Sequence, residues 1–308
     1  MEIKELQDRI RGLLKEKNAI MLAHNYQRAE IQEIADLTGD SYELSVRASK
    51  TDADVIVFCG VRFMAESAKI LSPGKTVLLP NADAGCPMAD MIDAGELARL
   101  KSLHPGAYVV SYVNTNADVK ALSDVCCTSS NAVSIVKAVP AEKVIFVPDK
   151  NLGSYVRQFV DKEMIVWDGY CPTHHHVYPE EVALLKQKYP GAPFLCHPEC
   201  RPEVVGLADR IASTSGIIRY AREDPHTEFI IGTEEGILYQ LRRNSPEKRF
   251  IPASRGFVCP NMKRTRLEDV AAALEKGRHE IKLSPKTIEK ARVPLERMID
   301  MGIAAGQG

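Results

Sequence analysis

The chain has 308 residues, of which 45% are hydrophobic and 26% charged, and its 40 basic and 41 acidic residues give a formal net charge of -1. This length exceeds what one hydrophobic core normally serves, so two or three domains are expected. The composition excludes a disordered or fibrous chain, and the balanced charge predicts no nucleic acid or anionic membrane as a partner.

The first predicted element is a charged amphipathic helix, MEIKELQDRIRGLLKEK. It lacks the apolar segment of a signal peptide, and no apolar run in the chain reaches the roughly 18 to 20 residues of a membrane-spanning helix. We therefore expect a cytoplasmic protein. In that reducing compartment the eight cysteines are expected to bind metal or act as nucleophiles rather than to form disulfides.

An internal repeat follows this helix. Three stretches align without gaps, and they read MLAHNYQRAEIQEIADLTGDS (21–41), VVSYVNTNADVKALSDVCCTS (109–129) and FLCHPECRPEVVGLADRIAST (194–214). Each begins with an apolar run that we predict to be a buried strand. Twelve residues after the last polar residue of that strand, each copy has an aspartate, namely Asp36, Asp124 and Asp209.

Each copy continues with a second predicted strand and then a Cys-Pro dipeptide. The strands read ADVIVFCG, EKVIFVPD and TEFIIGTE, and the dipeptides begin at Cys86, Cys171 and Cys259. Cys171 follows Cys86 by 85 residues and Cys259 follows Cys171 by 88, a period that suits a small domain rather than a solenoid unit. Short strands alternate with helical segments of about ten residues, which indicates parallel βαβ units.

We therefore predict an α/β fold with three homologous small domains. Each is a parallel sheet flanked by helices, and the three are arranged with pseudo-threefold symmetry around a central active site. The predicted boundaries are residues 1–87 for the first repeat, 88–172 for the second and 173–260 for the third. The tail, residues 261–308, reads as a helix near 267–276, a short strand HEIKL and a last helix from Pro285, and we expect it to complete the first repeat.

The Cys-Pro dipeptides predict a metal site, because equivalent residues of three symmetric repeats converge on one point. Sulfur ligands select iron-sulfur clusters, zinc or copper(I). A closed zinc or four-cysteine site would need a nearby fourth ligand, and no C-x2-C pair supplies one. A [4Fe-4S] cluster on three cysteines would instead leave one iron open as a Lewis acid. The alternative is that Cys-Pro merely ends a buried strand in each copy.

The remaining cysteines do not recur in all three repeats. We interpret them as small apolar residues of the core or of the pocket wall, and they are Cys59, Cys126, Cys127, Cys196 and Cys200. Of three consecutive histidines, only His174, three residues after Cys171, is placed to face the metal site, because neighbouring side chains do not share one face of an element.

Strand-end residues are the other candidates for the centre, because open parallel sheets bind ligands beyond the carboxyl ends of their strands. The first such position holds His24, Tyr112 and His197 in the three copies, and the position two residues later holds Tyr26, Asn114 and Glu199. Different groups at equivalent positions indicate different roles around one asymmetric substrate. The alternative is a set of hydrogen-bonded strand ends without chemistry.

Hydroxyl residues precede a predicted helix in each copy. They can cap free backbone N-H groups, which is the simplest interpretation. Helix N-termini also bind phosphate and carboxylate, so three of them pointing inward would form a pocket for a polyanion. The residues are Ser41, Ser129, Ser213 and Thr214.

These motifs together resemble the quinolinate synthase family. They are HNYQ, GDS, FMAE, AGCPMA, YVNTNA, CTSSNA, PDKNLG, CPTH, HPEC and STSG, spread over about residues 20–262. The resemblance implies a triangular protein of three α/β domains with a [4Fe-4S] cluster at their junction, one iron not being ligated by protein. It also implies a reaction that condenses iminoaspartate with dihydroxyacetone phosphate to quinolinate, phosphate and water for NAD biosynthesis.

Matched motif by motif, the resemblance implies that Cys86, Cys171 and Cys259 are the cluster ligands. Tyr26, Tyr112, Glu199 and His174 are expected to transfer protons. Substrate binding is expected from His24, Ser41, Tyr112, Asn114, Ser129, His197, Glu199, Ser213 and Thr214.

The likeness has one exception and also suggests a partner. Some family members carry C-x2-C-x2-C around the third ligand, but here Cys259 is followed by PNMKRTR, so no disulfide switch is expected. The enzyme that supplies iminoaspartate is a candidate transient partner. Three other functions stay open, which are an aconitase-type [4Fe-4S] hydro-lyase, an electron carrier and a zinc-binding scaffold.

Overall fold

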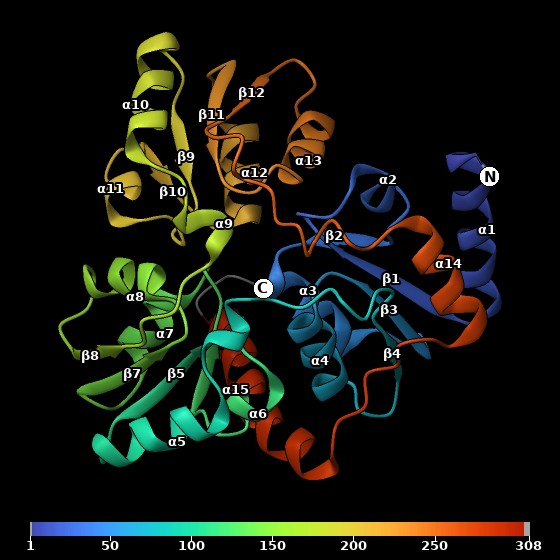
Figure 1. Cartoon of the computed structure of the whole chain (residues 1–308), viewed down its shortest axis with the longest axis horizontal. Helices are drawn as coiled ribbons and strands as arrows, with labels where there is room; N and C mark the ends of the chain where they lie inside the picture. Colours follow the sequence, from blue (N-terminus) through green and yellow to red (C-terminus); the bar gives the residue numbers. More distant parts are fainter. Residues whose placement is uncertain (1, 305–308) are drawn as a thin grey trace.

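The computed structural model describes residues 2–304. Three four-stranded sheets lie around a common centre (Figure 1), and all of their paired strands run parallel. The strand order is the same in each sheet, with the first and third strands in the middle and the second and fourth at the edges. This confirms the predicted α/β class with three small parallel sheets flanked by helices.

The strands are short, as expected for small units. The first sheet has the order β2 (Leu37–Gly39), β1 (Ala19–His24), β3 (Val55–Cys59) and β4 (Thr76–Leu78). The second has β6 (Val125–Cys127), β5 (Tyr108–Tyr112), β7 (Lys143–Val147) and β8 (Glu163–Val166). The third has β10 (Arg210–Ile211), β9 (Phe194–Cys196), β11 (Glu228–Gly232) and β12 (Arg249–Pro252).

The recurring aspartate joins the first two strands of each sheet. It directly precedes the second strand, where its backbone N-H donates to a carbonyl of the first strand and its carboxylate accepts the N-H of that same residue. The carboxylate distances are 2.7 Å for Asp36 with Met21, 2.7 Å for Asp124 with Val109 and 2.8 Å for Asp209 with Phe194. The repeat in the sequence therefore preserves a backbone contact, which three equivalent strands all need.

Helices cover both faces of each sheet, so the strands are apolar on both sides. In β1, Leu22 enters one core cluster and Met21 the other, since successive side chains point to opposite faces. The helices of the first repeat are α1 (Ile3–Glu16) with α14 (Leu267–Lys276) on one face, α3 (Ser41–Lys50) with α4 (Arg62–Leu71) on the other, and the short α2 (Ala29–Gln32) after β1.

The other two sheets repeat this arrangement. In the second repeat the helices are α5 (Ala94–Leu103), α6 (Ala117–Lys120), α7 (Ala132–Ala138) and α8 (Lys150–Arg157), preceded by a 3-10 turn at Ala89–Met91. In the third they are α9 (Pro172–His175), α10 (Pro179–Lys188), α11 (Pro202–Val205), α12 (Thr214–Glu223) and α13 (Ile237–Asn244).

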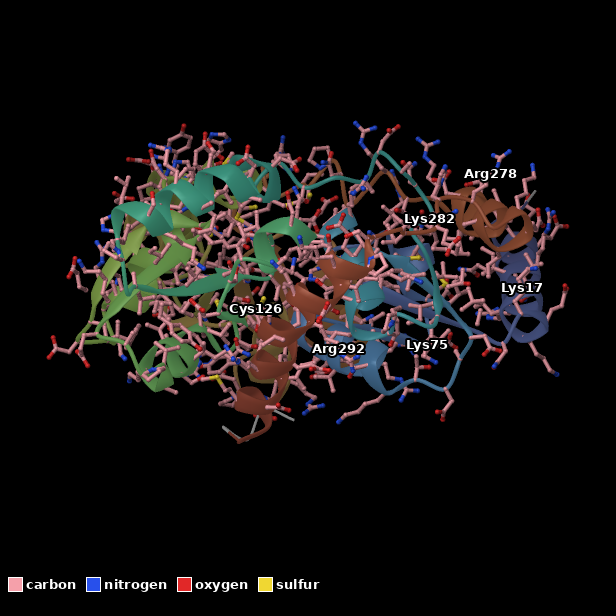
Figure 2. The ribbon with its side chains drawn as sticks, turned by 90° about the horizontal axis from the view of Figure 1, so that it is seen from below. Lys17, Lys75, Cys126, Arg278, Lys282 and Arg292 are labelled. Atoms are coloured by element: carbon pink, nitrogen blue, oxygen red, sulfur yellow. The ribbon has the colours of Figure 1, made fainter. Side chains whose placement is uncertain are left out.

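The tail is shared between two repeats. Helix α14 packs on α1 and β3 of the first sheet, whereas α15 (Pro285–Ala304) packs against β6, α6 and α7 of the second and against α4 of the first. Figure 2 shows α15 between the two units, with Cys126 of β6 and Arg292 of the helix labelled. The HEIKL segment forms only an isolated antiparallel bridge, Leu78 to Glu280, beside which the Ile281 N-H donates to the Val77 carbonyl of the edge strand β4 at 2.8 Å.

The predicted domain boundaries stay a prediction, and residues 305–308 of the tail lie outside the described residues. Within residues 2–304, no helix combines the length and the apolar character needed to cross a membrane.

Candidate active site and metal centre

The carboxyl ends of the first strands surround a buried cavity of about 130 Å³. His24 and Tyr112 end β1 and β5, and His197 directly follows β9, so each repeat contributes its strand end to one space. The same cavity is lined by all three thiols of the Cys-Pro dipeptides, Cys86, Cys171 and Cys259. The structure thus brings the equivalent residues of three repeats together.

The strand-end histidines of the first and third repeats are held in the same way. The Nδ1 atom of His24 accepts the backbone N-H of Tyr26 at 3.2 Å, and Nδ1 of His197 accepts that of Glu199 at 3.4 Å. Each ring therefore presents Nε2-H as a donor, and that of His197 reaches Ser129 Oγ at 3.2 Å. Burial lowers the pKa of His24 to about 3 and that of His197 to about 4, so both rings are neutral near pH 7.

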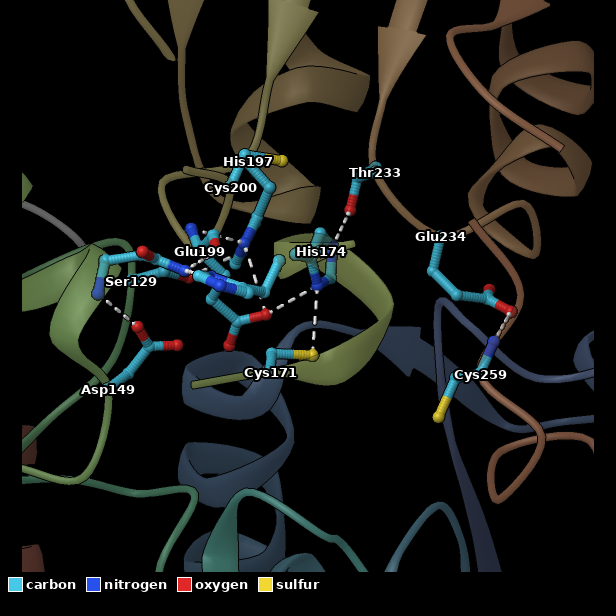
Figure 3. Close-up of polar contacts among 12 residues, drawn as sticks. Ser129, Asp149, Cys171, His174, His197, Glu199, Cys200, Thr233, Glu234 and Cys259 are labelled. Carbon is cyan, nitrogen blue, oxygen red and sulfur yellow. Dashed lines mark hydrogen bonds and ion pairs between the residues drawn. The ribbon is translucent and has the colours of Figure 1, made fainter. Parts of the chain in front are cut away.

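Glu199 is the central carboxylate (Figure 3), and its side chain is only 4% exposed. Tyr112 Oη donates to its Oε1 at 2.7 Å, and His174 Nδ1 lies 2.8 Å from its Oε2. Burial acts to raise the pKa of Glu199, but His197, His174 and the hydrogen bonds from His174 and Tyr112 outweigh it and lower the pKa to about 2. Glu199 is therefore an ionised acceptor.

A directed chain of hydrogen bonds follows from this ionised acceptor. If His174 donates from Nδ1 to Glu199, its Nε2 must accept, and the Thr233 hydroxyl lies 2.9 Å from it. Tyr26 Oη is 2.5 Å from Thr233 Oγ1 and can donate to it. The chain therefore runs from Tyr26 through Thr233 and His174 to Glu199, which also accepts from Tyr112. Figure 3 shows its part from Thr233 through His174 to Glu199.

The phenols are held as proton donors. Burial, followed by the charge of Glu199, raises the pKa of Tyr26 and of Tyr112 well above the ordinary value. Asn114 lies beside them, with Nδ2 at 3.4 Å from Glu199 Oε1, while its buried Oδ1 has no hydrogen-bond partner. A buried unsatisfied acceptor at a pocket wall indicates a place for a ligand donor.

The hydroxyl residues are not all helix caps. Asp40 caps α3, with Ser41 as the first helical residue, and Asn131 rather than Ser129 precedes α7. Only Ser213 is a cap, accepting the N-H of Gly216 at 3.3 Å. The cavity is lined by Ser41, Ser129 and Thr214, whereas Ser213 donates to Asp40 at 3.0 Å and lines a larger neighbouring cavity.

The three thiols share one local structure. Cys86, Cys171 and Cys259 each precede a proline and a tight turn, and the backbone N-H three residues on hydrogen-bonds the sulfur. Burial raises the pKa of all three thiols, that of Cys86 to about 12, while these backbone bonds, from Ala89, His174 and Met262, oppose the rise. Three half-buried thiols that line one cavity resist ionisation unless a positive charge is bound there, and N-H donors to sulfur suit an iron-sulfur cluster.

The thiols are not gathered as ligands of a single ion. Among the described residues, the group of three metal-binding side chains whose ligand atoms lie within 4.8 Å of one another is Cys171, His174 and Glu199. The sulfur atoms of Cys86, Cys171 and Cys259 are not all this close to one another. The ligands of a single zinc ion must be, because zinc-sulfur bonds are only about 2.3 Å long. Three more widely spaced thiols on one cavity fit a larger group such as a cluster.

The residues that follow the third strands also belong to the site, although none of them was predicted from the sequence. Thr233 completes the hydrogen-bond chain, and Asp149 and Glu234, both fully buried, stand two residues after β7 and β11. The sequence contained a signal for these residues, because the segments EKVIFVPD and TEFIIGTE align. Parallel sheets bind ligands beyond the carboxyl ends of their strands, and this holds for the third strand of each sheet as well as for the first.

Comparison with known proteins agrees with this geometry. A family model described as Quinolinate synthetase A protein matches residues 8–300. The chain belongs to the quinolinate synthetase A family. It is 56% identical over 300 residues to a quinolinate synthase of Geotalea uraniireducens (strain Rf4), covering 97% of each chain. It is 57% identical over 299 residues to one of Geobacter metallireducens, covering 97% of this chain and 98% of the relative.

A third relative has a similar level of identity. The quinolinate synthase of Methanosarcina barkeri is 53% identical over 303 residues, covering 98% of this chain and all of the relative, 100%.

In this member of the quinolinate synthetase A family, none of the eight cysteines forms a disulfide, and all lie within the described residues. The five outside the Cys-Pro dipeptides are buried, Cys59, Cys126, Cys127, Cys196 and Cys200. Burial raises the pKa of Cys126 to about 12, so this thiol stays protonated and behaves as a small apolar group. Cys200 Sγ lies 3.6 Å from the Gly232 carbonyl oxygen at the end of β11.

Proposed function

We propose that the cavity is the site at which iminoaspartate condenses with dihydroxyacetone phosphate to give quinolinate, phosphate and water. The activity is that of a quinolinate synthase and serves NAD biosynthesis, in keeping with the family. The observation that carries the proposal is the convergence of Cys86, Cys171 and Cys259, one from each repeat, on one buried cavity. In the proposal they hold a [4Fe-4S] cluster with one iron free of protein ligands.

The cluster, when bound, supplies a Lewis acid for a substrate oxygen or nitrogen. The anionic substrates meet no lysine or arginine among the described residues that line the cavity. Neutral donors must bind them, and the candidates are the Nε2-H groups of His24 and His197, the hydroxyls of Ser41, Ser129 and Thr214, and the amide of Asn114. The N-termini of α3 and α12, at Ser41 and Thr214, add their partial positive charge.

The proton transfers fall to the hydrogen-bond chain. Glu199 is ionised and can accept a proton, and Tyr26 and Tyr112 are protonated and can donate one. His174 and Thr233 connect the Tyr26 end to Glu199. Ring formation with loss of water and phosphate needs both directions of transfer, so a base and two phenols that line one cavity suit the reaction.

The test is an anaerobic product assay. The reconstituted protein, given iminoaspartate and dihydroxyacetone phosphate, should release quinolinate and phosphate in equal amounts. A protein that loads a cluster but dehydrates a hydroxy acid instead would be an aconitase-type hydro-lyase. A protein that binds one zinc ion and no iron would refute both.

Two further parts of the proposal concern the cell. The free thiols suit a reducing compartment, and we place the protein in the cytoplasm.

An imine hydrolyses in water, so brief contact with the enzyme that makes iminoaspartate would protect the substrate. Faster quinolinate formation from coupled enzymes than from premixed iminoaspartate would support that contact, and equal rates would oppose it.

A further inference from the structure

Glu234 is a fully buried carboxylate outside the hydrogen-bond chain. It stands two residues after β11, and its carboxylate lies beside the loop that carries the third thiol (Figure 3). Oε1 accepts the backbone N-H of Cys259 at 3.0 Å, and Oε2 accepts that of Gly236 at 2.7 Å. One side chain therefore joins the end of a central strand to the backbone of a proposed cluster ligand.

Lys263 is the counterion of this carboxylate. Its Nζ lies 2.9 Å from Glu234 Oε1, and it also donates to the backbone carbonyl of Tyr26 at 2.7 Å. Its own backbone N-H closes the turn onto the Cys259 carbonyl at 3.2 Å. The ion pair thus connects the third-repeat loop to the first-repeat residue that begins the hydrogen-bond chain.

Further contacts strengthen the same connection. Arg28 Nε donates to the Lys263 carbonyl at 2.9 Å, and Gln27 Nε2 donates to that of Met262 at 2.9 Å. Three consecutive residues of the first repeat are therefore bonded to residues 262–263. Movement of the Cys259 loop would displace Tyr26 as well.

The second repeat offers a partial parallel. Asp149 holds the equivalent position after β7, and burial raises its pKa, while backbone N-H groups of Leu152, Asn151 and Cys171 oppose that rise. Its Oδ2 has no close hydrogen-bond partner. The first repeat has Val61 at this position, so an acid recurs behind two of the three ligand loops. Of these two acids, only Glu234 is paired with a lysine, whose side chain is 14% exposed.

We propose that Glu234 and Lys263 are positioning residues, which fix the backbone of Cys259 for cluster binding and couple it to the placement of Tyr26. The inference rests on the proposed function, because it requires Cys259 to be a ligand. Groups that orient metal ligands typically contribute 10- to 100-fold to metal affinity or activity. Glu234 is fully buried and Lys263 is 14% exposed, so the loss of either partner leaves an uncompensated charge with little access to water and should disturb the loop.

The test uses the full-length protein with its cluster reconstituted anaerobically. Glu234→Gln and Lys263→Met should release iron to a chelator about 10- to 100-fold faster than the unchanged protein. Both should also alter the electron paramagnetic resonance spectrum of the reduced cluster. Glu235→Gln is the matched control, since the neighbouring Glu235 is exposed, and it should behave like the unchanged protein.

The outcomes are separable. An unchanged rate of iron release and an unchanged spectrum in Glu234→Gln would overturn the inference. If that variant does not fold, the double variant Glu234→Gln/Lys263→Met takes its place, because it removes both charges of the pair. It should also release iron faster and alter the spectrum, and unchanged values would overturn the inference. Cys259→Ser separates the two proposals, because a full cluster in that variant would refute the ligand assignment and hence the proposed function, whatever Glu234 does.

Discussion

Replacing Glu199 by glutamine tests the centre of the site with little change of shape. The two carboxylate oxygens face different donors, Tyr112 Oη at 2.7 Å and His174 Nδ1 at 2.8 Å. A glutamine offers one carbonyl oxygen, so one buried donor must face an NH2 group. The free energy of unfolding should fall by about 1 to 3 kcal/mol, the usual cost of an unsatisfied buried group.

The effect on turnover should be larger. Glutamine cannot take up a proton, and general acid-base groups contribute about 10² to 10⁴ in rate, so quinolinate formation should fall by that factor while the iron content is kept. The assay is anaerobic quinolinate formation per bound cluster, with Glu203→Gln as control, because Glu203 is exposed on α11. Near-normal turnover in Glu199→Gln with a full cluster would refute the assigned proton transfer.

Three other predictions address the metal, the fold and pH. Cys171→Ser should lose most of the iron while Cys200→Ser retains it, and equal iron in the two would contradict the ligand set. Asp124→Ala removes the acceptor of the Val109 N-H and should lower the free energy of unfolding in urea by about 1 to 3 kcal/mol; no change would show the contact to be dispensable. Burial lowers the pKa of His24 from 6.5 to about 3, so below pH 6.5 the unfolded chain binds a proton that the folded chain does not. Stability should therefore fall by about 1.4 kcal/mol per pH unit from pH 6.5 towards pH 3, and His24→Gln should flatten that slope if the reasoning holds.

The fold was largely predictable because its signals are local and repeated. The aspartates at 36, 124 and 209 mark one backbone contact in each sheet, and apolar runs mark strands covered on both faces. The short strand expected in HEIKL failed for a tertiary reason, since the segment pairs with β4 through one isolated bridge, Leu78 to Glu280. The position of α15 across two repeats depends on packing that no local pattern records.

The site was predictable at positions that have an equivalent in every copy of the repeat. Strand ends and Cys-Pro thiols have equivalents in every copy, so their convergence follows from symmetry. The helix caps were harder to predict. Asp40, rather than Ser41, caps α3, and Ser213 lines a neighbouring cavity instead of the central one. Contacts between repeats, such as that of Tyr26 with Thr233, need the docked arrangement and cannot be inferred from one copy.

The distribution of the thiols over three repeats has a thermodynamic consequence. A ligand that binds only the docked arrangement stabilises it by mass action, in proportion to the logarithm of its concentration over its dissociation constant. A cluster held by one cysteine from each repeat would act as a crosslink of this kind. Oxidative loss of the cluster would then remove more than the Lewis acid, because the three repeats would lose the one group that all of them bind, and the pocket they form together would become easier to open.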